Sequence, residues 1–233
     1  MLSNSDRTYR VLLLLVLTLV SANALAHGVD DSTRSFLQQN TGVQFVPFLY
    51  IGAKHMLTGY DHLLFLVGVI FFLYKSRDVL LYVTMFTIGH SLTLLWGVLG
   101  SIEVNAYLID AIIGLSVVYK GFDNLGGFKR ILGWQPDTRG AVLIFGLFHG
   151  FGLATKLQEF QLPEQGLLTN LLAFNIGVEL GQLAALVFIL IAINFWRRLP
   201  SFERFATLTN TLLMSAGLML MGYQLTGFTL QYL

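Results

Sequence analysis

The sequence contains no cysteine, and it has few charged residues for its length. The missing cysteine excludes disulfide bonds, thiolate metal sites and cysteine nucleophiles, so any bound metal must be held by nitrogen and oxygen ligands. Only 12% of the 233 residues are charged, whereas about a quarter of the residues of a soluble domain are charged. With 55% hydrophobic residues and a mean hydropathy of +0.69, the composition predicts a protein whose solvent is a lipid bilayer.

Several familiar functional motifs are absent as well. The chain has no P-loop, no Rossmann glycine pattern and no Gly-x-Ser-x-Gly motif, which argues against ATP-driven transport by this chain alone and against serine hydrolysis. The net charge is only +1 and the basic residues are scattered over connecting segments, so no nucleic-acid partner is expected. Whether the chain is an enzyme stays open at this point, and transport is favoured over catalysis.

The N-terminus has the pattern of a cleaved signal peptide over residues 1–26. Arg7 and Arg10 precede a ten-residue apolar run, which is followed by an A-x-A cleavage site. An uncleaved anchor helix is the alternative, although the apolar run is short for a membrane span. Cleavage would leave residues 27–44 as a short outer-face tail. It would also make His27 the new N-terminus, whose amine and imidazole together could chelate a metal ion.

Apolar segments after this region predict an all-α membrane protein, a bundle of about six transmembrane helices within residues 45–233. The segments are roughly 45–74, 79–99, 104–121, 139–157, 168–195 and 207–230. The first is too long for one perpendicular span, so we expect residues 43–54 to form a tilted or interfacial extension with a break near Gly59.

The loops between these segments carry a charge bias that predicts the orientation of the chain. One side has nine basic residues, namely Lys75, Arg77, Lys120, Lys129, Arg130, Arg139, Arg197, Arg198 and Arg204. The other side has only Arg34, Lys54 and Lys156 after the signal peptide. Because cytoplasmic loops are rich in Lys and Arg, both termini are expected outside the inner membrane of a bacterial-type cell. The signal peptide independently places the mature N-terminus outside.

Ionisable side chains inside a bilayer are strongly destabilising, so those that occur normally mark a pathway or a binding site. All four histidines after the tail, His55, His62, His90 and His149, fall within the predicted spans. His55 and His62 are seven residues apart and therefore share one face of a helix, with Asp61 beside His62. His90 and His149 fall near the middle of their spans, so side chains from several helices could meet in one polar cavity.

Acidic and amide side chains accompany these histidines. Asp110 lies in the outer half of the third span, and the spacing of Asn175, Glu179 and Gln182 makes one polar stripe on the fifth. Imidazoles with one or two carboxylates suit Ni, Co, Zn, Cu or Fe, whereas Mg²⁺ or Ca²⁺ would need more oxygen ligands. The predicted metal ligands are His55, Asp61, His62, His90, His149 and Glu179, with Asp110, Asn175, Gln182 and His27 as secondary candidates.

Helix packing is the plain alternative to a metal site. Membrane helices use His, Asn and Gln to hydrogen-bond one another, and small residues at GxxxG spacing let their backbones approach closely. Gly146 and Gly150 flank one of the histidines, and Gly177 and Gly181 flank the glutamate of the stripe, so close helix contacts are expected there. Four histidines and three acids in so uncharged a chain favour a metal site. A proton relay would use the same acids without needing four imidazoles.

Four sequence motifs resemble the HupE/UreJ family of hydrogenase and urease accessory membrane proteins. They are Gly52-x-x-His55-x-x-x-Gly59-x-Asp61-His62, Phe86-Thr87-x-x-His90-Ser91, Phe145-Gly146-Leu147-x-His149-Gly150 and Phe174-Asn175-x-Gly177-Val178-Glu179-x-Gly181-Gln182. The resemblance implies a nickel or cobalt permease that serves metalloenzyme maturation, with the His and Asp of the first motif at its site. Hydrogenase-type members usually have Pro directly after the first motif histidine. This chain has Met56 there and looks closer to a second, broader branch.

Together these patterns favour a transition-metal permease of the inner membrane. A cation would approach near His55, bind to the Asp61–His62 pair and Glu179, and move inward by way of His90 or His149. The runner-up is a membrane metalloprotein that keeps its ion, as an oxidoreductase or a hydrolase, and the third hypothesis is a structural or assembly subunit without metal. Expected partners are the bilayer and the metal ion, with a second copy of the chain or metalloenzyme maturation proteins also open.

Overall fold

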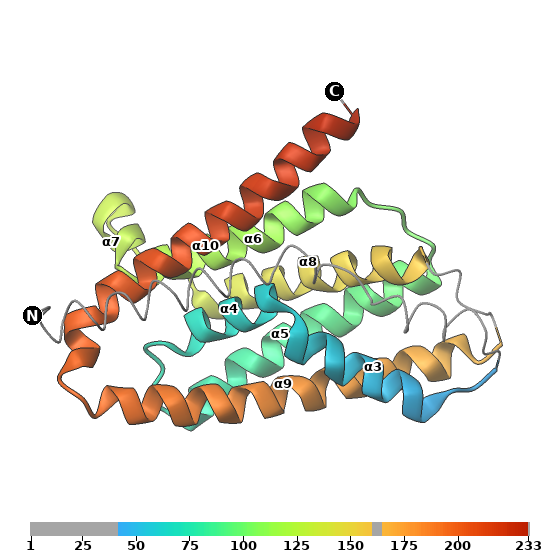
Figure 1. Ribbon diagram of the computed structural model, residues 1–233, viewed down its shortest axis with the longest axis horizontal. Coiled ribbons are helices and arrows are strands. Elements are labelled where there is room, and N and C mark those ends of the chain that lie inside the picture. Colours follow the sequence, from blue (N-terminus) through green and yellow to red (C-terminus); the bar gives the residue numbers. More distant parts are fainter. Residues whose placement is uncertain (1–41, 160–164, 233) are drawn as a thin grey trace, which may run out of the picture.

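The computed structural model describes residues 42–159 and 165–232, which are helical with no strand (Figure 1). The helices in this part are α3 (Phe45–Thr58), α4 (Tyr60–Ile70), α5 (Ser76–Leu99), α6 (Ala106–Asn124), α7 (Gly127–Leu132), α8 (Thr138–Gln158), α9 (Leu167–Arg197) and α10 (Ser201–Tyr232). The signal peptide predicted for residues 1–26 and most of the tail, His27 included, lie outside the described residues.

Four of these helices, α5, α8, α9 and α10, are long and apolar enough to span a membrane. Helix α4 is apolar but has only 11 residues, and α6 carries three charged side chains within its 19 residues. The all-α class and a multi-pass membrane protein are therefore confirmed, whereas the count of about six spans stays a prediction. The segment expected to be a loop between the third and fourth spans contains the short helix α7.

The first predicted span is divided into α3 and α4 at Gly59, which confirms the expected break. Gly59 has extended backbone, with φ −74° and ψ 100°, and its N–H donates to the carbonyl oxygen of His55 at 2.8 Å. A Cβ at this glycine would lie 3.0 Å from Nδ1 of His62 and 3.2 Å from Oδ1 of Asp61. Because of the break, Asp61 and His62 lie in the first turn of α4, and their side chains lie close to Gly59.

The long helices pack in three pairs, α3 with α9, α5 with α8, and α6 with α10 (Figure 1). Glycines at the crossings allow the backbones to touch. A Cβ on Gly146 of α8 would lie 2.5 Å from the carbonyl oxygen of Phe86 on α5. A Cβ on Gly181 of α9 would lie 2.7 Å from the carbonyl oxygen of Ala53 on α3. Both glycine pairs predicted to promote close packing do so, because only a residue without a side chain fits at these crossings.

Two buried apolar clusters leave a polar layer between them. The first, the α3-side cluster, includes Met56, Leu94, Leu153 and Phe174. The second, the α4-side cluster, includes Phe65, Phe86, Val142 and Leu186. On α5 and α8, His90 and His149 lie between the residues that belong to the two clusters. The fold thus surrounds the histidines with apolar packing on both sides along the bundle.

The C-terminal end of α4 is capped by a side chain of α9. Nη2 of Arg197 donates to the carbonyl oxygens of Ile70 and Phe71, at 2.7 and 2.6 Å. The same guanidinium lies 4.3 Å from the ring centroid of Tyr74. The last carbonyls of a helix lack partners within the helix, so this cation satisfies two of them and complements the helix dipole.

Replacing Arg197 by methionine is therefore expected to lower the free energy of unfolding by about 1–3 kcal/mol, because two partly buried carbonyls lose a charged donor. Thermal unfolding of the purified protein in detergent would measure the change. Arg198→Met is the matched control, since Arg198 is the neighbouring residue and its side chain is exposed. Equal losses in the two variants would contradict the capping role of Arg197.

Candidate metal centre

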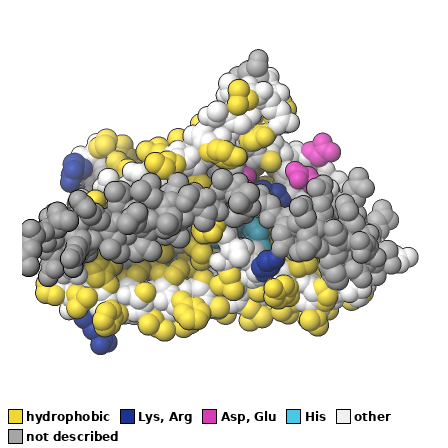
Figure 2. Space-filling view, viewed as in Figure 1, with side chains coloured by type: hydrophobic (Ala, Val, Ile, Leu, Met, Phe, Trp, Pro, Cys, Tyr) yellow, Lys and Arg dark blue, Asp and Glu magenta, His cyan; other side chains and the backbone are white. Residues whose placement is uncertain are grey.

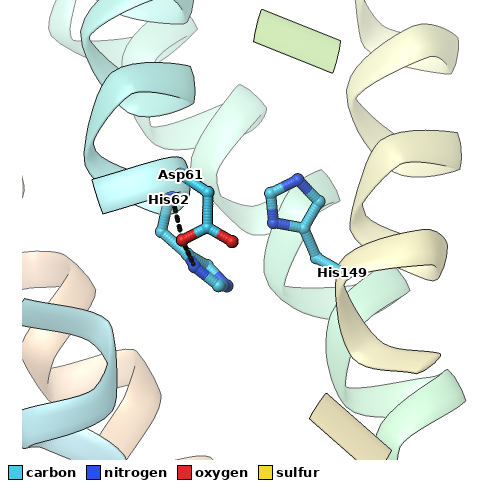
Figure 3. Close-up of side chains that lie close together, drawn as sticks. All are labelled: Asp61, His62 and His149. Carbon is cyan, nitrogen blue, oxygen red and sulfur yellow. Dashed lines mark hydrogen bonds and ion pairs between the residues drawn. The ribbon is translucent and has the colours of Figure 1, made fainter. Parts of the chain in front are cut away.

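Asp61, His62 and His149 form a cluster that could hold a metal ion (Figure 3). One ligand atom from each residue lies within 4.8 Å of the others. His62 and His149 are buried, with 4% and 1% exposure, and the Asp61 side chain is 19% exposed. Figure 3 shows the three side chains converging on the space between α4 and α8. Residues 88 positions apart in the sequence thus supply one compact donor set.

Asp61 fixes the orientation of the His62 ring. Its Oδ1 lies 2.9 Å from Nδ1 of His62 and also accepts the backbone N–H of His62 at 2.9 Å. When Nδ1 carries the proton and donates it to the carboxylate, Nε2 presents its lone pair to the centre. Carboxylate–histidine pairs of this kind orient imidazoles at metal sites and make them better ligands.

Two further histidines complete a group of four imidazoles around His62. The ring centroid of His62 lies 4.7 Å from that of His149, 5.2 Å from that of His55 and 6.1 Å from that of His90. The four rings come from four helices, α3, α4, α5 and α8. The structure therefore brings together all four histidines that the sequence placed within membrane spans.

Most ring nitrogens of this group are buried and have no hydrogen-bond partner within the described part of the chain. They are Nε2 of His55, Nε2 of His62, both nitrogens of His90 and Nδ1 of His149. An unsatisfied buried polar group is destabilising by about 1–3 kcal/mol, so five such atoms in one place are unusual for side chains that merely join helices. Interhelical hydrogen bonding would leave paired nitrogens, and the observed arrangement fits ligand binding better.

Helix α9 contributes to the surroundings of the centre in three different ways. Gln182 is buried, accepts a hydrogen bond from Oγ1 of Thr87 at 3.0 Å, and lines a narrow, mainly apolar cavity together with His62. Both amide atoms of Asn175 are buried without a partner in the described residues. Glu179 is exposed and lies outside the Asp61–His62–His149 cluster. The polar stripe predicted on this helix is thus divided between a buried face and an exposed one.

Asp110 is engaged in an ion pair beside the imidazole group. Nζ of Lys156 lies 3.0 and 3.2 Å from its two carboxylate oxygens, and Nε2 of Gln224 lies 3.4 Å from Oδ2. The contacts join α6 to α8 and α10. Lys156 was counted only for the orientation of the chain and not for the site, although it lies seven residues after His149 and so on the same face of α8. Ser116 on α6 was also missed; its Oγ lies 3.4 Å from Nε2 of His149.

The donor set decides which ions this centre could bind. Four imidazoles and one carboxylate are borderline nitrogen and oxygen donors, which suit divalent first-row transition metals. Mg²⁺ and Ca²⁺ require more oxygen ligands than Asp61 alone provides. The residues present therefore fit nickel, cobalt, zinc, copper or iron, and their chemistry does not rank these ions.

Comparison with known proteins identifies one family. A family model described as HupE / UreJ protein matches residues 31–232. No curated protein and no solved structure matches the chain. The matched range covers most of the 233 residues and includes all four motifs that carried the resemblance. The chain belongs to the HupE/UreJ family.

Proposed function

We propose that this chain is a permease that carries a divalent transition-metal ion across the inner membrane to supply metalloenzyme maturation. Nickel is the proposed ion and cobalt the alternative, because the HupE/UreJ family is associated with nickel and cobalt transport for hydrogenase and urease. The observation that carries the proposal is the set of five unpartnered, buried imidazole nitrogens around the Asp61–His62 pair. The metal ion is the cargo, so the centre must bind it and then release it.

The access route is proposed from the outer side, by way of His55. His55 is partly exposed, whereas the other three histidines of the group are buried. Figure 2 shows histidine atoms visible on the face in view, near basic and acidic side chains. The ion would meet His55 first and then bind Nε2 of His62 together with Asp61 and His149. His90, with both ring nitrogens unpartnered, is the next ligand along the bundle.

The division of the first span into α3 and α4 supports this assignment. Transporters commonly place ion sites where a membrane helix is interrupted, because the two half-helix ends bring backbone dipoles to the ion. The C-terminal end of α3 carries negative partial charge, which favours a cation. The N-terminal end of α4 carries positive partial charge, which favours the anionic form of Asp61. The break at Gly59 brings the C-terminal end of α3 next to Asp61 at the start of α4, which supports a cation site there.

The cavity that His62 and Gln182 line is the proposed inward route. Its lining is His62 and Gln182 at polar positions, with Met56, Phe65, Leu66, Val69, Tyr82, Val83, Phe86 and Val142 around them. An apolar cavity this narrow would obstruct a hydrated ion, so the proposed transport requires a second conformation that opens it toward the inside. Glu179 is proposed to meet the ion in such a second conformation, since a carboxylate within a membrane span needs a compensating charge.

The topology completes the proposal. We infer six spans, with α3 and α4 together forming the first, and both termini on the outer side after removal of residues 1–26. The excess of basic residues in the connections on one side supports this orientation.

The proposal predicts that cells producing the chain accumulate more radiolabelled nickel than cells without it, and that excess cobalt reduces the uptake. The purified protein should bind nickel and lose it again on dialysis, because a permease site exchanges its ion. Nickel or another metal retained in stoichiometric amount after dialysis would favour the stable metalloprotein instead. Protein that binds no transition metal would leave only the structural subunit.

A further inference from the structure

A positively charged side chain stands beside the centre that is proposed to bind a cation. Lys156 lies two helical turns after His149 on the same face of α8, and its side chain is 24% exposed. Its ammonium faces the carboxylate of Asp110, which lies beside Gly152, three residues after His149. From there its charge acts electrostatically on Asp61, His55 and His149. A fixed ammonium at this position repels every incoming cation, so its presence requires an explanation.

Asp110 holds this ammonium in place from the neighbouring helix. Its carboxylate is 12% exposed and contacts Nζ of Lys156 with both oxygens, at 3.0 and 3.2 Å. Gln224 of α10 supports the carboxylate at 3.4 Å. Gly152, one turn before Lys156 on α8, lies next to this carboxylate, since a Cβ placed there would be 3.4 Å from Oδ1 of Asp110. The ion pair joins α6 to α8, and its contact with Gln224 adds α10.

We propose that Lys156 and Asp110 form a charge gate that sets which cations the metal centre accepts. The inference rests on the proposed function and adds a selectivity mechanism to it. Asp61 and Asp110 together would attract any divalent cation by charge alone. Without Lys156, Asp61 and Asp110 would carry two negative charges between them. With its positive charge added, the three side chains carry a net charge of −1. Mg²⁺ and Ca²⁺, which depend on charge and oxygen ligands, are then held weakly. Nickel and cobalt gain most of their binding from the imidazole nitrogens and remain bound.

Near-isosteric substitutions separate this role from a purely structural one. Lys156→Gln removes the charge and keeps a hydrogen-bond donor toward Asp110, while Asp110→Asn removes the opposite charge and leaves the ammonium unneutralised. Calorimetric titration of purified, full-length protein in detergent with nickel, with and without excess magnesium chloride, would measure the effects. Lys156→Arg is the charge-preserving control, and Lys156→Met is a second neutral variant if Lys156→Gln does not yield folded protein.

The two single variants are expected to change nickel affinity in opposite directions. Lys156→Gln should bind nickel roughly tenfold more tightly and become sensitive to magnesium, because a repulsive charge within the low-dielectric bundle is removed. Asp110→Asn should bind roughly tenfold more weakly for the opposite reason. The double variant and Lys156→Arg should both return close to the wild-type affinity and magnesium insensitivity.

A purely structural ion pair predicts a different pattern. Both single variants would then weaken nickel binding and lower the thermal unfolding temperature, and magnesium would have no added effect in either. That result would overturn the charge gate and leave the proposed permease intact. Wild-type protein that binds no nickel would overturn the metal centre itself, and the charge gate with it.

Discussion

Replacing His62 by alanine is expected to reduce nickel accumulation to the level of cells that lack the chain. His62 is the central histidine of the group, since its ring centroid lies 4.7 to 6.1 Å from the ring centroids of the other three histidines. It is also the histidine that Asp61 holds in place, through the 2.9 Å contact to Nδ1. Loss of an orienting partner alone weakens metal sites by about 10–100-fold, and loss of the ligand itself should weaken binding by at least about a hundredfold.

The measurement pairs whole-cell nickel uptake with the amount of chain in the membrane. Asp61→Asn should reduce uptake less than His62→Ala, because His62 remains and the asparagine side chain still offers an oxygen ligand, although the negative charge and the orienting contact to His62 are altered. Thr211→Ala is the control: this exposed side chain of α10 donates a hydrogen bond within its own helix, to the carbonyl oxygen of Thr207. Undiminished uptake by His62→Ala at equal protein level would remove this histidine from the site.

Replacing Gly177 by leucine is expected to prevent recovery of folded protein. A Cβ at this position would overlap the backbone carbonyl of Leu49, so a side chain must push α3 away from α9. The backbone cannot move aside as a flexible side chain can. We therefore expect the free energy of unfolding to fall by at least the roughly 1–3 kcal/mol typical of overpacked cores. Because α3 carries His55 and leads into the turn before Asp61, its displacement should also abolish nickel binding.

Gly222→Leu provides the matched control for this substitution. Gly222 also lies within a long helix, α10, but apart from its own helix backbone no atom of the described residues lies within 4 Å of a Cβ placed there. Size-exclusion chromatography and thermal unfolding in detergent would compare the two variants with the wild type. A Gly177→Leu protein that is recovered, unfolds and binds nickel like the Gly222→Leu protein would show that the α3–α9 contact is not needed for the fold.

Much of the architecture could be read from one-dimensional patterns. Apolar runs place the helices because a membrane-spanning helix must be apolar along its whole length, and α5, α8, α9 and α10 follow these runs closely. The break at Gly59 was signalled by a segment too long for one span. The glycine pairs at 146/150 and 177/181 marked close crossings because small residues permit backbone contact.

Which residues make up the candidate metal centre could be decided only from the tertiary structure. The spacing of Asn175, Glu179 and Gln182 predicts that they share one face of α9, yet Glu179 is exposed while Gln182 is buried. A spacing rule gives the angle between side chains around one helix. It does not reveal where the neighbouring helices lie. The edge of a buried face therefore cannot be located from the sequence of α9 alone.

By itself, the sequence determined that this chain is a multi-pass helical protein with an unusual set of histidines and acids inside its spans. Hydropathy and helical periodicity are local properties, so they survive any arrangement of the helices. The tertiary structure decided that the imidazole rings of His55, His90 and His149 lie around that of His62 and that Asp110 pairs with Lys156, 46 residues away. These contacts depend on which helices pair and at what depth, and that is fixed only when glycine-lined crossings bring α5 against α8 and α3 against α9.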